Sequence, residues 1–306
     1  MTTSALPTHP CYLNGAFTPL NEAKVSVLDR GFIFGDGIYE VLAVYNGKVF
    51  RFAQHMERLE RSLRETRIPN PHSRQEWLEI ATKLIATHAY SINSNGQNDA
   101  KNVGGNQLIY LQVTRGVAMR DHVMAQGITP TVFAMCNPMH LPSFEQRTQG
   151  VACVSADDFR WQKAHLKSTS LLGAVFSRQI SFDAGAVETI MFRDDALSEA
   201  STSNVWVVKN GRVLGVPKDH LVLEGIRYGL LQEMCAGLGI DFELRRISRE
   251  EVLTCDELLL TSATKEVLPV TRLDGAKVGN GQPGAIYQKL YAAYQSEKNK
   301  MGSDGK

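Results

Sequence analysis

The chain has 306 residues, a length that suggests two domains, and its 43% hydrophobic and 21% charged residues are typical of a globular protein. The 33 basic and 32 acidic residues leave a net charge of +1, which argues against a nucleic-acid partner, since such binding needs a concentrated basic face. No apolar stretch approaches the roughly 20 residues of a membrane span, and the N-terminal residues lack the pattern of a secretion signal. We therefore expect a soluble, cytoplasmic protein without a membrane partner.

Cysteine and histidine spacing argues against metal chemistry. The five cysteines are scattered, without a C-x-x-C pair, which favours buried reduced thiols over disulfides or a zinc site. The eight histidines show no H-E-x-x-H pattern, and the usual glycine-rich nucleotide loops are missing from the sequence. We expect no bound metal.

The first half of the chain predicts a mixed α/β domain. Asn46-Gly47 predicts a hairpin with a type I′ turn, and apolar residues at steps of four, three and four from Phe52 to Leu63 predict an amphipathic helix. A polar, glycine-rich segment at 93–106 predicts a mobile surface loop. Further elements are expected as strands at 11–14, 41–45, 48–52, 107–115 and 131–136, and as a helix at 77–92.

Turn signals and a polar stretch predict an interdomain linker at 138–149, between a small domain at 1–137 and a larger one at 150–306. In the larger domain Asn210-Gly211 predicts a second hairpin, and the tail from Ser296 should fray. The other expected elements are strands at 151–155, 188–192, 204–209 and 257–261, and helices at about 170–182 and 225–235.

Five stretches carry side chains suited to chemistry, at 29–41, 113–122, 167–175, 197–204 and 223–226. Each also has an ordinary structural interpretation: a glycine-rich turn, a surface loop, a lysine at a helix start, a polar turn and a plain helix start. An arginine–histidine loop could bind a carboxylate, a desolvated lysine could attack a carbonyl, and a helix start could bind an anion. No single stretch is specific for one function, but the five stretches together, in this order and at this spacing, form a specific pattern.

The sequence resembles the class IV aminotransferases, which have fold type IV and use pyridoxal 5′-phosphate (PLP). The resemblance runs from about Cys11 to Tyr291 and is greatest to bacterial D-amino-acid aminotransferases. It is carried by DRGFIFGDGIYEV, QHMERL, VTRGVAMRDH, RWQKAHLKSTSLLGAV, SEASTSN and TSATKEVLPV. The Arg120-x-His122 pair is the most discriminating feature. The implied fold is a small α/β domain followed by a larger domain with a pseudo-barrel.

The resemblance implies roles around the cofactor ring. Lys167 would bond covalently to PLP and then move the proton at the substrate Cα. Glu199 would pair with the pyridine nitrogen and keep it protonated, and Leu223 would pack on the ring face.

The resemblance also implies a phosphate site, formed by Arg58, by Ser203 and by the backbone N–H groups of Ile226 and Arg227. The chain departs from the family at two positions here. Arg227 stands where the family usually has a residue with a hydroxyl group. Its side chain could turn outward, or it could turn inward as a second cation for the phosphate group, and we expect the inward arrangement. Ala263 replaces the usual threonine, with Thr264 beside it.

The substrate carboxylate would be held by Tyr39, Arg120 and His122. Glu40 would lie near Lys167, behind the residues that contact the substrate. In the family the Arg-x-His pair reaches the site from the neighbouring subunit, so the resemblance implies an obligate homodimer. The implied reaction exchanges an amino group between D-amino acids, such as D-alanine or D-glutamate, and 2-oxo acids, such as 2-oxoglutarate or pyruvate.

Alternatives remain open on the same fold. They are activity on branched-chain L-amino acids or (R)-amines, the aminodeoxychorismate lyase reaction, and a PLP-binding homologue without catalysis. The retained Lys167, Glu199 and Arg120-x-His122 argue against the last of these.

Overall fold

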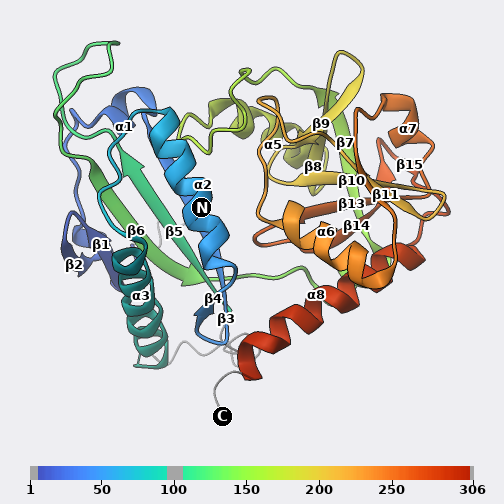
Figure 1. Ribbon diagram of the computed structural model, residues 1–306, viewed down its shortest axis with the longest axis horizontal. Helices are drawn as coiled ribbons and strands as arrows, with labels where there is room; N and C mark the ends of the chain where they lie inside the picture. The colour runs from blue at the N-terminus through green and yellow to red at the C-terminus, as the bar shows by residue number, and fades with distance from the viewer. Residues whose placement is uncertain (1–5, 95–105, 304–306) are drawn as a thin grey trace. The chain divides into compact units, whose positions relative to one another are not determined.

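A computed structural model describes residues 6–94 and 106–303 (Figure 1). The chain forms two compact units. Unit 1 comprises Met1–Met139, Lys167–Ser170 and Met301–Lys306, and unit 2 comprises His140–Leu166 and Leu171–Lys300. The chain therefore enters unit 1 again for four residues in the middle of unit 2.

Unit 1 contains a six-stranded sheet in the order β2-β1-β6-β5-β3-β4, in which every neighbouring pair is antiparallel. Asn46 and Gly47 have φ of 51° and 75°, so the predicted type I′ hairpin is confirmed. The strands are β1 Pro10–Leu13, β2 Ala16–Pro19, β3 Gly37–Tyr45, β4 Lys48–Val49, β5 Gln107–Thr114 and β6 Thr131–Pro138.

Two helices, α2 (Phe52–Glu65) and α3 (Arg74–Ser94), pack on this sheet and enclose the core of unit 1 (Figure 1). Met56, Leu59 and Leu63 of α2 are buried there, as their spacing predicted. The short helices η1 (Leu20–Glu22) and α1 (Arg30–Phe34) lie in the segment before β3. Most of the loop expected at 93–106 lies outside the described residues.

Residues 167–170 extend the sheet of unit 1 at β3. The Tyr39 N–H donates to Lys167 O at 2.9 Å, and the Thr169 N–H donates to Gly37 O at 2.9 Å. Ser168 pairs with Ile38 as an isolated antiparallel bridge. The ordinary interpretation of Lys167 as a lysine at a helix start is therefore wrong, because its backbone pairs with a strand. The helix expected at about 170–182 is confirmed, with bounds Leu172–Asp183.

Unit 2 contains a nine-stranded sheet in the order β12-β11-β10-β13-β14-β7-β8-β9, with β15 also paired to β14. Its strands are β7 Val151–Asp157, β8 Glu188–Arg193, β9 Ala196–Ala200, β10 Asn204–Lys209, β11 Arg212–Gly215, β12 Phe242–Leu244, β13 Glu257–Ser262, β14 Glu266–Leu273 and β15 Ala276–Lys277. The strands expected at 151–155, 188–192, 204–209 and 257–261 are confirmed. Asn210 and Gly211, with φ of 52° and 75°, form the second predicted hairpin turn.

The sheet of unit 2 must curl into a half-barrel. The bend Ser201–Ser203 joins β9, at one end of the strand order, to β10, five strand positions away. A flat sheet would separate these strands by about 24 Å, at roughly 4.8 Å per spacing. Three linking residues span at most about 14 Å. Curling brings the two strands together and places the bend at the mouth of the half-barrel.

The remaining helices are α4 Phe144–Gln149, α5 Leu172–Asp183, α6 Arg227–Leu238, α7 Arg249–Leu253 and α8 Ala285–Ser303, and all of them lie in unit 2 except the last three residues of α8. The segment expected as a linker contains α4, which begins with a capping box between Ser143 and Gln146. The expected fraying of the tail is corrected as far as Ser303, because α8 is held by long-range contacts. Lys298 Nζ lies 2.6 Å from Glu266 Oε1, for example.

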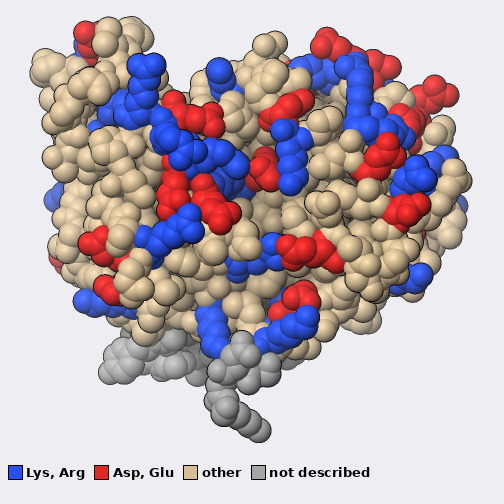
Figure 2. Space-filling view, in the orientation of Figure 1, with Lys and Arg blue, Asp and Glu red and all other residues tan. Residues whose placement is uncertain are grey.

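The surface shown in Figure 2 carries Lys and Arg side chains interspersed with Asp and Glu. Charged pairs at the protein surface include Arg74 with Glu60 at 2.7 Å and Arg245 with Glu251 at 2.6 Å. Among the residues that the structure describes, no helix is both long and apolar enough to cross a lipid bilayer.

We predict that Gly116→Ala destabilises unit 1, because Gly116 has φ of +103° and an added Cβ would lie 2.1 Å from the Thr129 backbone oxygen. The backbone strain and the clash together should lower the free energy of unfolding by about 2–4 kcal/mol, measured by urea denaturation. Gly127→Ala is the matched control, since its φ is +72° but its Cβ would meet nothing within 4 Å. That variant should lose only about 1 kcal/mol; equal losses would show that strain alone matters.

Candidate functional site

Successive residues of β3 project to opposite faces of the sheet, and this alternation separates two candidate groups. Tyr39 lies on the face away from the helices, where its ring stacks on Tyr110 at 5.8 Å. Lys167 Nζ lies 4.1 Å from the centre of the Tyr39 ring. The structure thus brings two sequence-predicted residues together, and the lysine is only partly exposed because its backbone is paired with β3.

Glu40 projects to the opposite face and is completely buried against α2. Arg58 binds both of its oxygens, with Nε to Oε1 and Nη2 to Oε2 each at 2.8 Å, and His55 Nδ1 lies 2.7 Å from Oε2. Burial alone would raise the pKa of Glu40, but Arg58 and His55 hold that pKa well below its usual value. The contacts of Glu40 are therefore with Arg58 and His55, rather than with Lys167.

Arg120 and His122 lie in an exposed loop after β5, and both contact the Phe34 ring, at 5.5 Å and 5.3 Å. Arg30 Nη1 donates to Asp121 O at 2.5 Å, which fixes the loop between the pair. The base of the loop is fixed by an ion pair between Asp36 and Arg115, with Nε 2.8 Å from Oδ2. A rigid base thus presents two side chains that suit a carboxylate.

Glu199 is the buried acid of unit 2, 5% exposed, at the end of β9. Its Oε1 lies 2.7 Å from Arg160 Nη1, and the Leu223 N–H donates to its two oxygens at 3.3 and 3.2 Å. Burial raises the pKa of Glu199, although Arg160 and the Leu223 amide act in the opposite direction. A further positive partner would therefore stabilise the ionised carboxylate.

Arg160 is a functional candidate that the sequence reasoning missed. Asp158 holds it through two contacts, Nε to Oδ1 at 2.9 Å and Nη2 to Oδ2 at 2.8 Å, which aim its remaining nitrogen at Glu199. Burial opposes the charge of Asp158, but Arg160 lowers the pKa of that carboxyl to about 2. The available signal was the spacing Asp158-x-Arg160 shortly before the candidate lysine.

Asn204 connects Glu199 to the start of α6. Its Nδ2 lies 3.2 Å from Glu199 Oε2 and 2.8 Å from Leu223 O. Gly225 packs so closely on the Asn204 side chain that an added Cβ would lie 2.1 Å from its Oδ1. The structure therefore brings Leu223 and the Ile226–Arg227 helix start to the same cluster as Glu199.

The remaining candidates lie at two turns of unit 2. Ser203 Oγ donates to Glu188 Oε1 at 2.7 Å. Arg227 is 3% exposed, and its Nη2 lies 3.4 Å from Ala263 O and 3.1 Å from the Tyr294 hydroxyl on α8. The Arg227 side chain is therefore turned into the protein, against the turn between β13 and β14 that also holds Thr264.

The candidate residues thus form several small clusters in each unit. Unit 1 carries an amine beside an aromatic ring, an Arg–Glu–His cluster and an Arg-x-His loop. Unit 2 carries a buried carboxylate with its arginine and two polar turns near the start of α6. Taken one by one, an amine suits an aldehyde, a buried carboxylate suits a protonated ring nitrogen, and a helix start suits a phosphate group.

The chain belongs to the class IV aminotransferases, because the model of that family, described as "Amino-transferase class IV", matches residues 37–273. It is an aminotransferase, and its fold is the mixed α/β fold type IV with the curled sheet described above. The cofactor of these enzymes is PLP, and their substrates are amino acids and 2-oxo acids.

The similar proteins are consistent with this assignment. The chain is 36% identical to a D-alanine aminotransferase of Bacillus licheniformis over 283 residues, 92% of this chain and 95% of that one. It is 32% identical to a D-alanine aminotransferase of Staphylococcus epidermidis, over 93% and 96% of the two chains. A branched-chain amino acid aminotransferase from T.th., complexed with N-(5′-phosphopyridoxyl)-L-glutamate, shares the fold with a TM-score of 0.83 at 20% identity, covering 96% and 95%.

The described residues fit PLP. Lys167 supplies a partly buried amine beside an aromatic ring, which an aldehyde requires. Glu199 supplies a buried carboxylate whose raised pKa marks a site that would gain from a protonated ring nitrogen. The start of α6 supplies a helix N-terminus for an anion, and Asn204, the residue after Ser203, joins the segment before this helix to Glu199.

We predict that Arg160→Met lowers the free energy of unfolding by about 3–5 kcal/mol near pH 8, because buried Glu199 loses the Arg160 cation, whereas Asp158 keeps Arg193 at 3.1 Å. Removing Arg160 raises the folded-state pKa of Glu199 further. Below that pKa the buried carboxyl group is neutral and does not oppose folding, whereas above it the group ionises and destabilises the folded state. The loss of unfolding free energy should therefore be smaller at about pH 5.5 than at about pH 8. Urea denaturation at both values measures it.

Adding Glu199→Gln to this variant should recover part of the loss, since an amide needs no cation. Arg245→Met is the control: its pair with Glu251 is 35% and 39% exposed, so its cost should stay below about 1 kcal/mol. A pH-independent loss would contradict the coupling between Arg160 and Glu199.

Proposed function

We propose that the enzyme exchanges amino groups between D-amino acids, such as D-alanine and D-glutamate, and 2-oxo acids, such as 2-oxoglutarate and pyruvate. The proposal is carried by the Arg120-x-His122 pair, which the loop after β5 presents together with an amine and a tyrosine in the same unit. The printed activity of the two relatives, D-alanine aminotransferase, supports it.

Lys167 provides the amine that binds the cofactor and then, as a general base, removes and returns the proton at the substrate Cα. When bound, PLP supplies the ring that accepts the electron pair left at that carbon. Glu199 holds the positive charge on the ring nitrogen, and Arg160 keeps Glu199 oriented and ionised for this purpose. Leu223 packs against the ring.

The phosphate group is bound by Ser203, by the Ile226 and Arg227 backbone N–H groups and by Arg58. The two contacts between Arg58 and Glu40 fix the guanidinium plane, so that Glu40 acts as a positioning residue for Arg58. Arg227, Ala263 and Thr264 line the turn that completes this region.

The substrate carboxylate is bound by Tyr39 together with Arg120 and His122 of a second copy of the chain. Two hydrogen-bonded segments of unit 1 support this homodimer, because they expose apolar side chains beside the pair. The Ala118 N–H donates to Leu28 O at 3.3 Å, and the side chains of Val27, Phe32 (on α1), Met119 and Val123 are each 70–78% exposed. Solvent-exposed apolar surface of this kind is typical of an interface.

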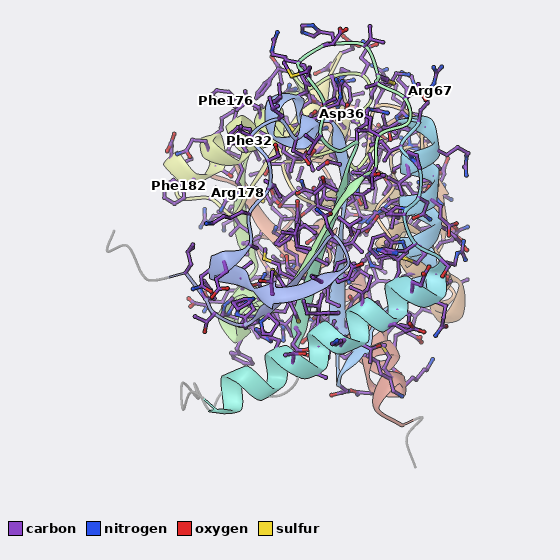
Figure 3. The ribbon with its side chains drawn as sticks, turned by 90° about the vertical axis from the view of Figure 1, so that its left-hand side faces the viewer. Phe32, Asp36, Arg67, Phe176, Arg178 and Phe182 are labelled. Carbon is purple, nitrogen blue, oxygen red and sulfur yellow. The ribbon has the colours of Figure 1, made fainter. Side chains whose placement is uncertain are left out.

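The polarity of α5 also supports an interface between copies. Ser177 and Ser181 are completely buried, whereas Phe176 and Phe182 are 58% and 69% exposed and project from the helix (Figure 3). An isolated surface helix has the opposite pattern, with its apolar side chains turned to the core. We propose a cytoplasmic location, which five buried, free cysteines support.

We predict that holoenzyme mixed with D-alanine alone loses the absorbance of the aldehyde form of PLP and releases one pyruvate per site. L-Alanine should leave the spectrum unchanged, because the carboxylate and Cα–H are fixed relative to one catalytic lysine. Stopped-flow absorbance with paired D- and L-amino acids measures this half-reaction. Reaction with L-leucine, an (R)-amine or aminodeoxychorismate instead would reassign the substrate, and a bound but unreactive cofactor would indicate a binding protein.

Lys167→Ala should abolish the half-reaction, and Lys163→Ala is its matched control. Lys163 lies four residues earlier in the same segment but is exposed, so it should retain full activity. Borohydride reduction followed by peptide mapping identifies the lysine that bonds to PLP. Labelled Lys163 would contradict the assignment.

We predict that mixed dimers of Lys167→Ala and Arg120→Ala subunits regain activity that neither homodimer has. If the pair acts across the interface, each mixed dimer holds one intact site and one doubly defective site. Refolding equimolar subunits and measuring turnover per mixed dimer should give about half the activity of the parent dimer, since separated sites act additively. Without recovery, Arg120 would act within its own subunit.

A further inference from the structure

The bend Ser201–Ser203 packs on a buried ion pair between Glu188 and Lys265. Glu188, the first residue of β8, is completely buried. All three hydroxyls of the bend donate to its carboxylate, and so does the Thr202 N–H at 3.2 Å. A carboxylate therefore lies directly behind Ser203, where the proposed function requires an anion to bind.

Lys265 supplies the positive charge of this pair. Its Nζ lies 2.8 Å from Glu188 Oε1 and 3.1 Å from Thr202 Oγ1, and its side chain is 17% exposed. The Lys265 N–H donates to Ser262 Oγ at 3.1 Å, which fixes the turn that carries it. Burial alone would raise the pKa of Glu188, but Lys265 holds that pKa below its usual value.

Several donors share a single oxygen of Glu188. Thr202, Ser203 and Lys265 all contact Oε1. A hydroxyl has one proton, so Ser203 cannot donate to Glu188 and to an anion at the same time. Because Lys265 stays on Oε1, the Ser203 proton can turn toward an anion without leaving the carboxylate uncompensated.

We propose that Lys265 is a further cofactor-affinity residue, which offsets the charge of Glu188 and thereby releases the Ser203 hydroxyl to the phosphate group of PLP. The inference rests on the proposed function. It also gives a reason why this chain tolerates Ala263, since the Ser203 hydroxyl that Lys265 releases takes over part of the role of the missing hydroxyl donor.

The test is the affinity of the Lys265→Met apoenzyme for PLP and for pyridoxal, which lacks the phosphate group. Fluorescence titration should show a PLP Kd raised at least about tenfold, with the Kd for pyridoxal changed by less than about twofold. Lys298→Met is the matched control: Lys298 lies 2.6 Å from buried Glu266, with exposures of 13% and 1%, close to the 17% and 0% of the Lys265 pair. It should leave both affinities near those of the parent.

Glu188→Gln added to Lys265→Met should restore most of the PLP affinity, because it removes the uncompensated charge and weakens the competing acceptor. This double variant also tests the proposal if Lys265→Met alone folds poorly. Equal weakening of PLP and pyridoxal, an equal effect of Lys298→Met, or unchanged PLP affinity would each overturn the role of Lys265. A parent protein that binds PLP but does not transaminate would refute the proposed function and leave this result standing.

Discussion

Burying an ionised carboxylate requires a compensating cation, and this requirement organises the candidate residues within each unit. Glu40 is paired with Arg58, Asp158 and Glu199 share Arg160, and Glu188 is paired with Lys265. Asp158 and Arg160 lie in the same segment after β7, but each of the other pairs joins two different parts of the fold and so also fixes how they pack. Because an unpaired buried charge costs several kcal/mol, these geometries are strongly determined.

The two faces of β3 separate two groups of candidate side chains in unit 1. One face directs Glu40 into the core, where it orients Arg58, and the other places Tyr39 under the Lys167 amine. A shift of one residue in the pairing of β3 with β5 would exchange these faces. The register Tyr39↔Gln112 is thus as important to the site as the identity of its side chains.

The sequence predicted what depends on local patterns. The Asn-Gly turns fixed two hairpins, and the apolar spacing from Phe52 to Leu63 located α2. Family motifs supplied the candidate residues, and the comparisons establish the family itself. Contacts between distant residues left no local pattern: the Lys298–Glu266 pair ordered a tail expected to fray, and the role of Arg160 depends on Glu199, 39 residues away. The pairing of residues 167–169 with β3 was missed for the same reason, because backbone hydrogen bonds do not require particular side chains.

The return of the chain to β3 at residues 167–170 has a consequence for biosynthesis. A ribosome that has released residues 1–139 has delivered all six strands of the first sheet, yet the backbone groups of Gly37 and Tyr39 still lack their partners. These are supplied only when Thr169 emerges, a few seconds later at roughly 5–20 residues per second. Until then the nascent domain presents a short open strand edge to its surroundings, and the segment that closes this edge is the one that carries Lys167.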